Sequence, residues 1–351
     1  MLTFIIYKLI VCVAVFTLSL AVAAYSTLWE RKLSALLQDR VGPDRAGPFG
    51  LLQPLADGGK MFFKEEIIPN VSNRFLFILG PSLFMLTALM TGSVIPWCKD
   101  VYIKGTLYSV QITDINIGVL FLFGVVSIGV YGIMIGGWAS NNKYALLGAI
   151  RASSQMISYE IAMGIAVIAL IITSGGTLSL REIVEQQDAG FANVVWQPLG
   201  FIIFFVCALA ETNRAPFDLP ECEAELVGGY HTEYSSMKLG LFLFAEYINM
   251  FISSAVMAAF YFGGYNFPFA HELYDAMGLA DGSKWIAIIG FGAYFTKIFL
   301  FISVFMWIRW TLPRFRYDQL MNLGWRYLLP LSLLNLAITV VVEFCRGHIA
   351  F

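Results

Sequence analysis

Long apolar runs, separated by polar connections, organise the whole chain. A run of about 20 residues, with a range of about 17–25, is long enough to cross a bilayer as a helix. Such runs recur eight times, at residues 4–28, 75–96, 115–137, 155–175, 196–212, 239–262, 286–308 and 325–345. The fifth run is the shortest. The pattern predicts an all-α integral membrane protein with eight transmembrane helices, forming a single membrane domain over residues 1–351.

Composition agrees with this pattern. The chain is 58% hydrophobic and 13% charged, whereas a soluble domain has about 45–50% apolar and about 25% charged residues. One water-soluble core could not bury this excess of apolar side chains, so membrane lipid is an expected partner. The net charge of -2 argues against a nucleic-acid partner, which requires a basic patch.

Basic residues are distributed unevenly among the connections. Fifteen of the 22 Lys and Arg residues lie in the loops after the first, third, fifth and seventh runs. Loops rich in Lys and Arg usually stay on the inner side of the membrane. We therefore expect these four loops to face a cytoplasm or a mitochondrial matrix, and both termini to face the opposite side.

The first inner loop, residues 29–74, is the longest connection in the chain. Gly-Pro pairs at 42–43 and 47–48 predict turns. Leu51–Glu66 then places apolar residues on one helical face and charged residues on the other. That pattern is typical of an amphipathic helix lying in the membrane interface. From these residues alone, a surface anchor without any chemistry stays open as an alternative.

Carboxyl groups gather in the inner loop after the fifth run, residues 211–238. Its six acids are Glu211, Asp218, Glu221, Glu223, Glu225 and Glu233. Glu160 and Glu246 lie within apolar runs nearby. An ionisable group inside a membrane is costly and therefore suggests a functional site.

These acids predict a proton relay. Burial and like-charge neighbours both favour the neutral form of a carboxyl group, and close acids titrate together. The alternative is a set of salt bridges between helices, for example Glu160 with Arg151 or Glu246 with Lys297. Acids outnumber bases around the loop, which favours the relay.

Motifs for independent redox chemistry are missing. The sequence has no G-x-x-x-x-G-K-[ST] and no G-x-G-x-x-G, so it shows no phosphate-binding loop. Its five cysteines form no C-x-x-C pair and its three histidines are far apart, which disfavours a zinc, iron–sulfur or haem site. The residues can carry protons and hold an amphipathic ligand, but electrons would have to come from partners.

The sequence resembles the eight-span membrane subunit of the proton-translocating NADH:quinone oxidoreductase, respiratory complex I; this is the subunit termed H in bacteria and one in mitochondria. The resemblance covers nearly the whole chain. Its most specific stretches are Glu30-Arg31-Lys32, Arg40-Val41-Gly42-Pro43, Gly50–Asp57, Gly137-Trp138-Ala139-Ser140-Asn141, Ser158-Tyr159-Glu160, Glu211–Leu219 and Pro313–Met321.

The resemblance implies three groups of site residues. Residues matching the wall of a quinone tunnel are Glu30, Arg31, Arg40, Ala56, Asp57 and Lys60. Residues matching the contact with the peripheral arm are Arg309, Arg314, Arg316 and Asp318. Residues matching an acidic proton path from the quinone chamber are Glu160, Glu211, Asp218, Glu221, Glu223, Glu225, Glu233 and Glu246.

The resemblance also implies the cofactors, partners and location. Quinone, either ubiquinone or menaquinone, would be the substrate. No cofactor would be covalently bound, and NADH, FMN and iron–sulfur clusters would belong to partner subunits. Expected partners are the quinone-site subunits of the peripheral arm, small membrane-arm subunits and antiporter-like subunits. A bacterial inner membrane is favoured, with a mitochondrial inner membrane as the alternative.

Two other functions stay open at this point. One is the equivalent subunit of a ferredoxin-dependent dehydrogenase or membrane hydrogenase, against which a first loop suited to quinone argues. The other is a cation-coupled secondary transporter. Transporters usually show repeated broken helices in corresponding halves, whereas this sequence has one clearly broken region, at Glu211–Glu233.

Overall fold

The computed structural model is predominantly helical. It describes residues 2–103, 106–188, 191–218, 227–268, 270–278 and 283–346. Over these residues, seven helical segments are long and apolar enough to cross a membrane. They are α1 (Leu2–Leu37), α3 (Arg74–Thr91), α4 (Gly118–Ala139), α5 (Lys143–Thr173), α10 (Ser236–Phe262), α12 (Lys284–Thr311) and the continuous segment Tyr317–Cys345. A multi-pass helical membrane protein is thereby confirmed.

The fifth predicted span, residues 196–212, is a shorter helix than the others. Residues Asn193–Trp196 form α7, and α8 then runs over Pro198–Glu211, which is 14 residues. At about 1.5 Å per residue, α8 reaches roughly 20 Å, less than the roughly 30 Å of a bilayer's hydrocarbon core. The count of eight transmembrane helices therefore stays a prediction.

Two helices extend well beyond their apolar runs. Helix α1 continues to Leu37, so the predicted first inner loop begins inside it. Helix α5 begins at Lys143, twelve residues before its apolar run, because the Asn142 side chain caps it by accepting from the Tyr144 amide. The hydropathy estimate ended the first of these spans too early and began the second too late, since helical hydrogen bonding continues through polar residues.

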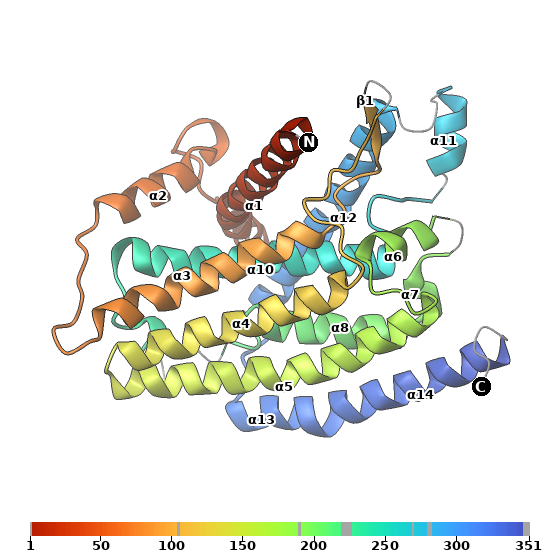
Figure 1. Cartoon of the computed structure of the whole chain (residues 1–351). Coiled ribbons are helices and arrows are strands. Elements are labelled where there is room, and N and C mark those ends of the chain that lie inside the picture. Colours follow the sequence, from red (N-terminus) through yellow and green to blue (C-terminus); the bar gives the residue numbers. More distant parts are fainter. Residues whose placement is uncertain are drawn as a thin grey trace.

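The rest of the first inner loop contains η1 (Pro48–Gly50) and α2 (Gln53–Phe63), and α2 falls inside the predicted Leu51–Glu66. Gly50 has a φ of 77°, and a Cβ there would collide with the Pro43 carbonyl. Only glycine fits this turn without strain. Figure 1 shows α2 beside the helical bundle, at the opposite side of the molecule from α11. Its place in the membrane interface stays a prediction.

The connections at the other end of the bundle hold small elements. Strands β1 (Val101–Ile103) and β2 (Thr106–Tyr108) pair antiparallel. The sequence did not predict this short strand pair, which leaves the all-α class of the protein unchanged. Strands of three residues are too short to show a hydrophobic period. The short helices are η2 (Gly92–Val94), α6 (Leu180–Gln186) and α11 (Ala270–Ala276), with η3 (Gly229–His231) in the acidic loop at the opposite end. An ion pair between Arg181 and Asp100 joins α6 to the hairpin.

Helix α10 lies at the centre and has the largest buried share of the seven segments. It packs against α1, α3 and α12, and Figure 1 shows it running behind α3. The last segment comprises α13 (Tyr317–Asn322), a π-helical turn over Leu323–Leu328, and α14 (Leu329–Cys345), which packs along α5. The C-terminal ends of α1 and α12 and the N-terminal half of α10 meet on one side of the bundle, where the site lies.

Candidate functional site

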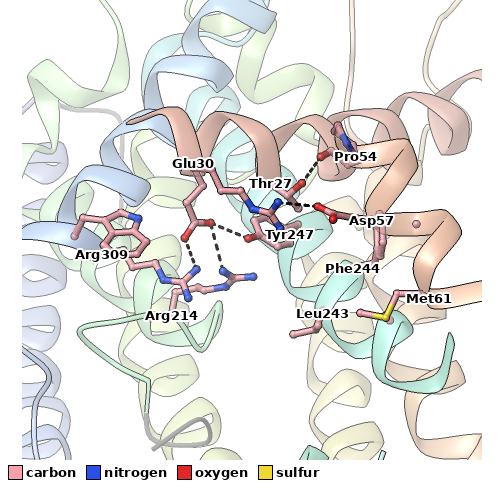
Figure 2. Close-up of a pocket in the computed structure, with 15 residues that line it drawn as sticks. Thr27, Glu30, Pro54, Asp57, Met61, Arg214, Leu243, Phe244, Tyr247 and Arg309 are labelled. Atoms are coloured by element: carbon pink, nitrogen blue, oxygen red, sulfur yellow. Dashed lines mark hydrogen bonds and ion pairs between the residues drawn. The ribbon is translucent and has the colours of Figure 1, made fainter. Parts of the chain in front are cut away.

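A cavity of about 430 Å³ lies where α1, α2, α10 and α12 meet (Figure 2). Apolar side chains cover much of its wall. Buried charged side chains gather at one end, and the more exposed pair Arg31–Asp57 lies on the side of α2. The lining residues are Ala24, Thr27, Glu30, Arg31, Pro54, Asp57, Gly58, Met61, Arg214, Gly240, Leu243, Phe244, Tyr247, Arg309 and Trp310.

Glu30, near the end of α1, is the centre of the charged side. Its side chain is 7% exposed. Arg309 of α12 lies 2.6 Å from one carboxylate oxygen. The Tyr247 hydroxyl of α10 donates to the other oxygen at 2.8 Å, and Arg214 lies 3.5 Å from that oxygen. Three segments far apart in sequence therefore hold one carboxylate.

Arg214 connects this carboxylate to a second one. Its guanidinium group lies 3.2 Å from Glu246, which also accepts from the Tyr230 hydroxyl at 3.1 Å. The guanidinium carbon also lies 4.0 Å from the centre of the Tyr247 ring. We call this group the Arg214 cluster; its members are Glu30, Arg214, Tyr230, Glu246, Tyr247 and Arg309. Removing one partner from a buried pair leaves an uncompensated charge and costs about 3–5 kcal/mol.

Helix α2 closes the more exposed side of the cavity. Asp57 on α2 pairs with Arg31 on α1 at 2.8 Å and accepts from Gln53 at 3.2 Å. Ala56 and Lys60 are exposed and do not line the cavity. Two of the predicted tunnel residues on α2 therefore lie outside this cavity, while Asp57 is part of its wall.

Arg40 lies in a separate hollow, also of about 430 Å³. Its Nε donates to Gln38 at 2.8 Å. Lys32 and Phe49 line the same hollow, with the Lys32 ammonium 5.9 Å from the centre of the Phe49 ring. The predicted tunnel residues thus divide between two places on this side of the molecule.

The other predicted proton-path acids have separate contacts. Glu160 accepts from the Ser127 hydroxyl, and Glu211 ends α8, which packs against α5. Asp218 is buried and pairs with Arg314 at 2.8 Å, and Glu233 accepts from the Asn142 amide at 2.7 Å. Predicted acids outside the described residues are Glu221, Glu223 and Glu225.

The residues of the two salt bridges considered as alternatives, Glu160 with Arg151 and Glu246 with Lys297, contact other groups. Glu246 pairs with Arg214, and Lys297 instead donates to the carbonyl groups of Phe262 and Gly264 at 2.7 and 2.8 Å. Arg151 lies 5.8 Å from the centre of the Tyr317 ring. The membrane-embedded lysine therefore binds backbone oxygens at the end of α10, while the embedded acid belongs to the Arg214 cluster.

Comparisons with known proteins agree along nearly the whole chain. The sequence model of a family described as NADH dehydrogenase matches residues 9–340. The H subunit (form 1) of NADH-quinone oxidoreductase from Cytophaga hutchinsonii is 66% identical over 96% of this chain and 96% of its own. The H subunit from Flavobacterium johnsoniae is 58% identical over 97% of this chain and 95% of its own. Subunit 8 of the NADH-quinone oxidoreductase from Rhodothermus marinus is 49% identical over 87% of this chain and 88% of its own.

The chain belongs to the family of NADH-quinone oxidoreductase H subunits. The resemblance seen in the sequence is thereby confirmed, and the chain is a subunit of an enzyme complex whose other subunits are its partners. None of these relatives favours the hydrogenase, ferredoxin-dependent dehydrogenase or transporter alternatives.

Within this H-subunit fold, the predicted arm-contact residues occupy different environments. Arg309 lies in the Arg214 cluster, and Arg314 pairs with Asp218. Arg316 is exposed at the start of α13, and Asp318 is exposed in its first turn. Arg309 therefore faces the cavity, whereas Arg316 and Asp318 are available at the surface.

Sequence reasoning missed three members of the Arg214 cluster: Arg214 itself, Tyr230 and Tyr247. Arg214 lies inside the specific stretch Glu211–Leu219 but was counted only as a loop charge. A signal was present, because a buried acid such as Glu246 needs a cationic partner. The tyrosines gave no comparable signal, since aromatic residues are common throughout membrane spans and their ends.

Proposed function

We propose that this subunit forms part of the wall of the quinone-binding chamber and couples quinone reduction to proton translocation. The observation that carries the proposal is the joining of an apolar wall to a buried charged end in one cavity. A quinone has an apolar isoprenoid tail and a headgroup with two carbonyl oxygens. Ligand sites usually combine an apolar lining with a few polar groups that fix orientation.

The charged end suits the chemistry of the headgroup. Reduction of a quinone to a quinol consumes two electrons and two protons. Iron–sulfur clusters on partner subunits, supplied from NADH through FMN, would provide the electrons. Negative charge arriving on the substrate would attract the guanidinium groups of Arg309 and Arg214. Their ion pairs with Glu30 and Glu246 would weaken as a result. Both carboxylates would then bind protons more readily, because a nearby opposite charge is what favours their ionised form.

Protons would leave the cluster along the acidic path. From Glu246 they would pass among the acids matched by the family resemblance toward the pumping subunits. These acids are Glu160, Glu211, Asp218, Glu221, Glu223, Glu225 and Glu233. The path would lie on the inner side of a bacterial inner membrane, with both termini outside. Peripheral-arm subunits would contact the surface at Arg316 and Asp318, and small membrane-arm and antiporter-like subunits would flank the bundle.

The proposal is tested by placing a larger side chain on α2 so that it fills part of the cavity. Met61 lines the cavity and Leu55 on the same helix is 68% exposed, so Met61→Trp and Leu55→Trp form a matched pair. In the intact complex, Met61→Trp should raise the KM for quinone about ten-fold, which corresponds to about 1.4 kcal/mol. Leu55→Trp should leave that KM unchanged.

NADH:ferricyanide activity supplies the control for electron input, since it bypasses quinone, and it should be the same in both variants. An unchanged quinone KM in an assembled Met61→Trp complex would show that this cavity is not part of the quinone chamber. The membership of the family would stand in either case.

A further inference from the structure

Three polar side chains point to one place at the end of α8 that lies away from Glu211. A Cβ built on Gly200 would lie 3.0 Å from Gln197 Oε1, 3.2 Å from Asn335 Nδ2 and 3.5 Å from the Tyr261 hydroxyl. Apart from the chain neighbours of Gly200 and the backbone of its own helix, these are the three nearest heavy atoms to that position. Gln197 precedes α8, Tyr261 belongs to α10 and Asn335 belongs to α14. Because Gly200 has no side chain, polar atoms of three segments lie around the space beside its backbone. An added methyl group would be tight there and would require the nearest of these side chains to shift.

All three polar groups are withdrawn from the surface. Gln197 is 3% exposed, Asn335 5% and Tyr261 0%. Their converging atoms have no hydrogen-bond partner within the described part of the chain. A buried polar atom without a partner costs about 1–3 kcal/mol, so three of them around one glycine require an explanation.

The orientation of the Gln197 amide is fixed by its other contacts. Its nitrogen donates to the Ala169 carbonyl at 2.8 Å and to the Thr339 hydroxyl at 3.3 Å. The carbonyl oxygen must therefore be the atom that faces Gly200. The space thus offers an acceptor from Gln197, a donor from Asn335 and a hydroxyl from Tyr261 that can act as either.

We propose that Gly200 forms the floor of a binding site for one water molecule. The water donates to Gln197 Oε1, accepts from Asn335 Nδ2 and exchanges a third hydrogen bond with the Tyr261 hydroxyl. Three partners is the usual number for a buried water in a protein. A metal cation fits less well, because the Asn335 amide nitrogen is a donor and none of the three groups carries a negative charge.

The water joins α14 to the rest of the bundle. Helix α14 turns a buried polar face inward, formed by Ser332, Asn335, Thr339 and Glu343 at helical spacing. Lipid provides no hydrophobic driving force between helices, so packing and polar contacts hold them together. The bridging water satisfies this polar face where α8, α10 and α14 meet. Its role is structural, and it lies apart from the Arg214 cluster and the proposed quinone chamber.

The first test is the sign of a stability change in the assembled complex. Tyr261→Phe should speed thermal inactivation of NADH:quinone activity about five-fold, because the variant breaks a hydrogen bond to the water. Without a water, the same variant would remove an unsatisfied hydroxyl, and inactivation would be unchanged or slower. The matched variant Tyr294→Phe loses a direct bond from its hydroxyl to the Ala255 carbonyl, which is 2.9 Å long, and calibrates the assay.

The second test is direct and needs no variant. Electron cryomicroscopy of the intact complex, at a resolution that resolves its other buried waters, should show a density peak within about 2.6–3.2 Å of all three polar atoms. A map that shows buried waters elsewhere but no peak beside Gly200 overturns the proposal.

Discussion

At the scale of single residues, Arg214 holds the candidate site together. It is 7% exposed and lies between the carboxylates of Glu30 and Glu246. Sequence analysis assigned Glu30 to the tunnel, Glu246 to the proton path and Arg309 to the arm contact. The structure brings all three into one cluster. Nothing local in the sequence relates positions this far apart, so the acids could be predicted singly but their common partner could not.

This arrangement predicts the behaviour of Arg214 variants. Arg214→Leu leaves Glu246 and Glu30 without a shared cation and should destabilise the protein by about 3–5 kcal/mol. Arg214→Lys keeps the charge but not the planar fork that reaches two carboxylates, so its loss should be intermediate. The measurement is the amount of assembled complex on native gels, together with NADH:quinone activity per assembled complex.

Arg74 serves as the control for this series. It is exposed at the start of α3, so Arg74→Leu should assemble normally. Wild-type assembly and activity of Arg214→Leu would show that the two buried carboxylates do not depend on Arg214.

At the scale of elements, the sequence predicted the apolar middle of each long helix but missed the polar end of α1 and the polar start of α5. Apolar runs mark what lipid and neighbouring helices can bury, whereas helix ends depend on capping groups such as Asn142. The difference matters for the site, because Glu30 and Arg31 lie in the last turns of α1 and not in a loop. A rigid helix thereby positions both side chains at the cavity.

Glycines set how closely α3 and α4 approach each other. A Cβ on Gly132 of α4 would lie 2.9 Å from the Phe84 amide nitrogen, whereas a Cβ on Gly124 of the same helix would meet nothing within 4 Å. Gly132→Ala should force the helices apart and destabilise the protein by about 1–3 kcal/mol. Gly124→Ala should be tolerated. The yield of assembled complex after mild solubilisation distinguishes the two variants, and equal yields would contradict the close contact.

At the scale of the whole molecule, the pattern of apolar runs predicted the helical membrane architecture, while its count of eight spans stays a prediction. It located all seven long helical segments of the described chain. A helix that crosses a bilayer needs a long stretch of apolar residues, and such a stretch is directly visible in the sequence. The pattern missed the pairing of β1 with β2. The cavity was not predictable from the pattern, since it depends on how the ends of α1, α2, α10 and α12 meet. The family resemblance, and not the spacing of residues, indicated that a quinone site belongs there.

The central claim is that quinone occupies the cavity beside the Arg214 cluster. Photolabelling of the intact complex with a quinone that carries a photoreactive headgroup, with and without excess unlabelled quinone, tests it most directly. The account predicts label on the helices that line the cavity, which are α1 within Ala24–Arg31, α2 within Gln53–Phe63, α10 within Gly240–Tyr247 and the end of α12 at Arg309 and Trp310. This label should be lost when unlabelled quinone competes. Competed label found only on segments of this chain that do not line the cavity would contradict it.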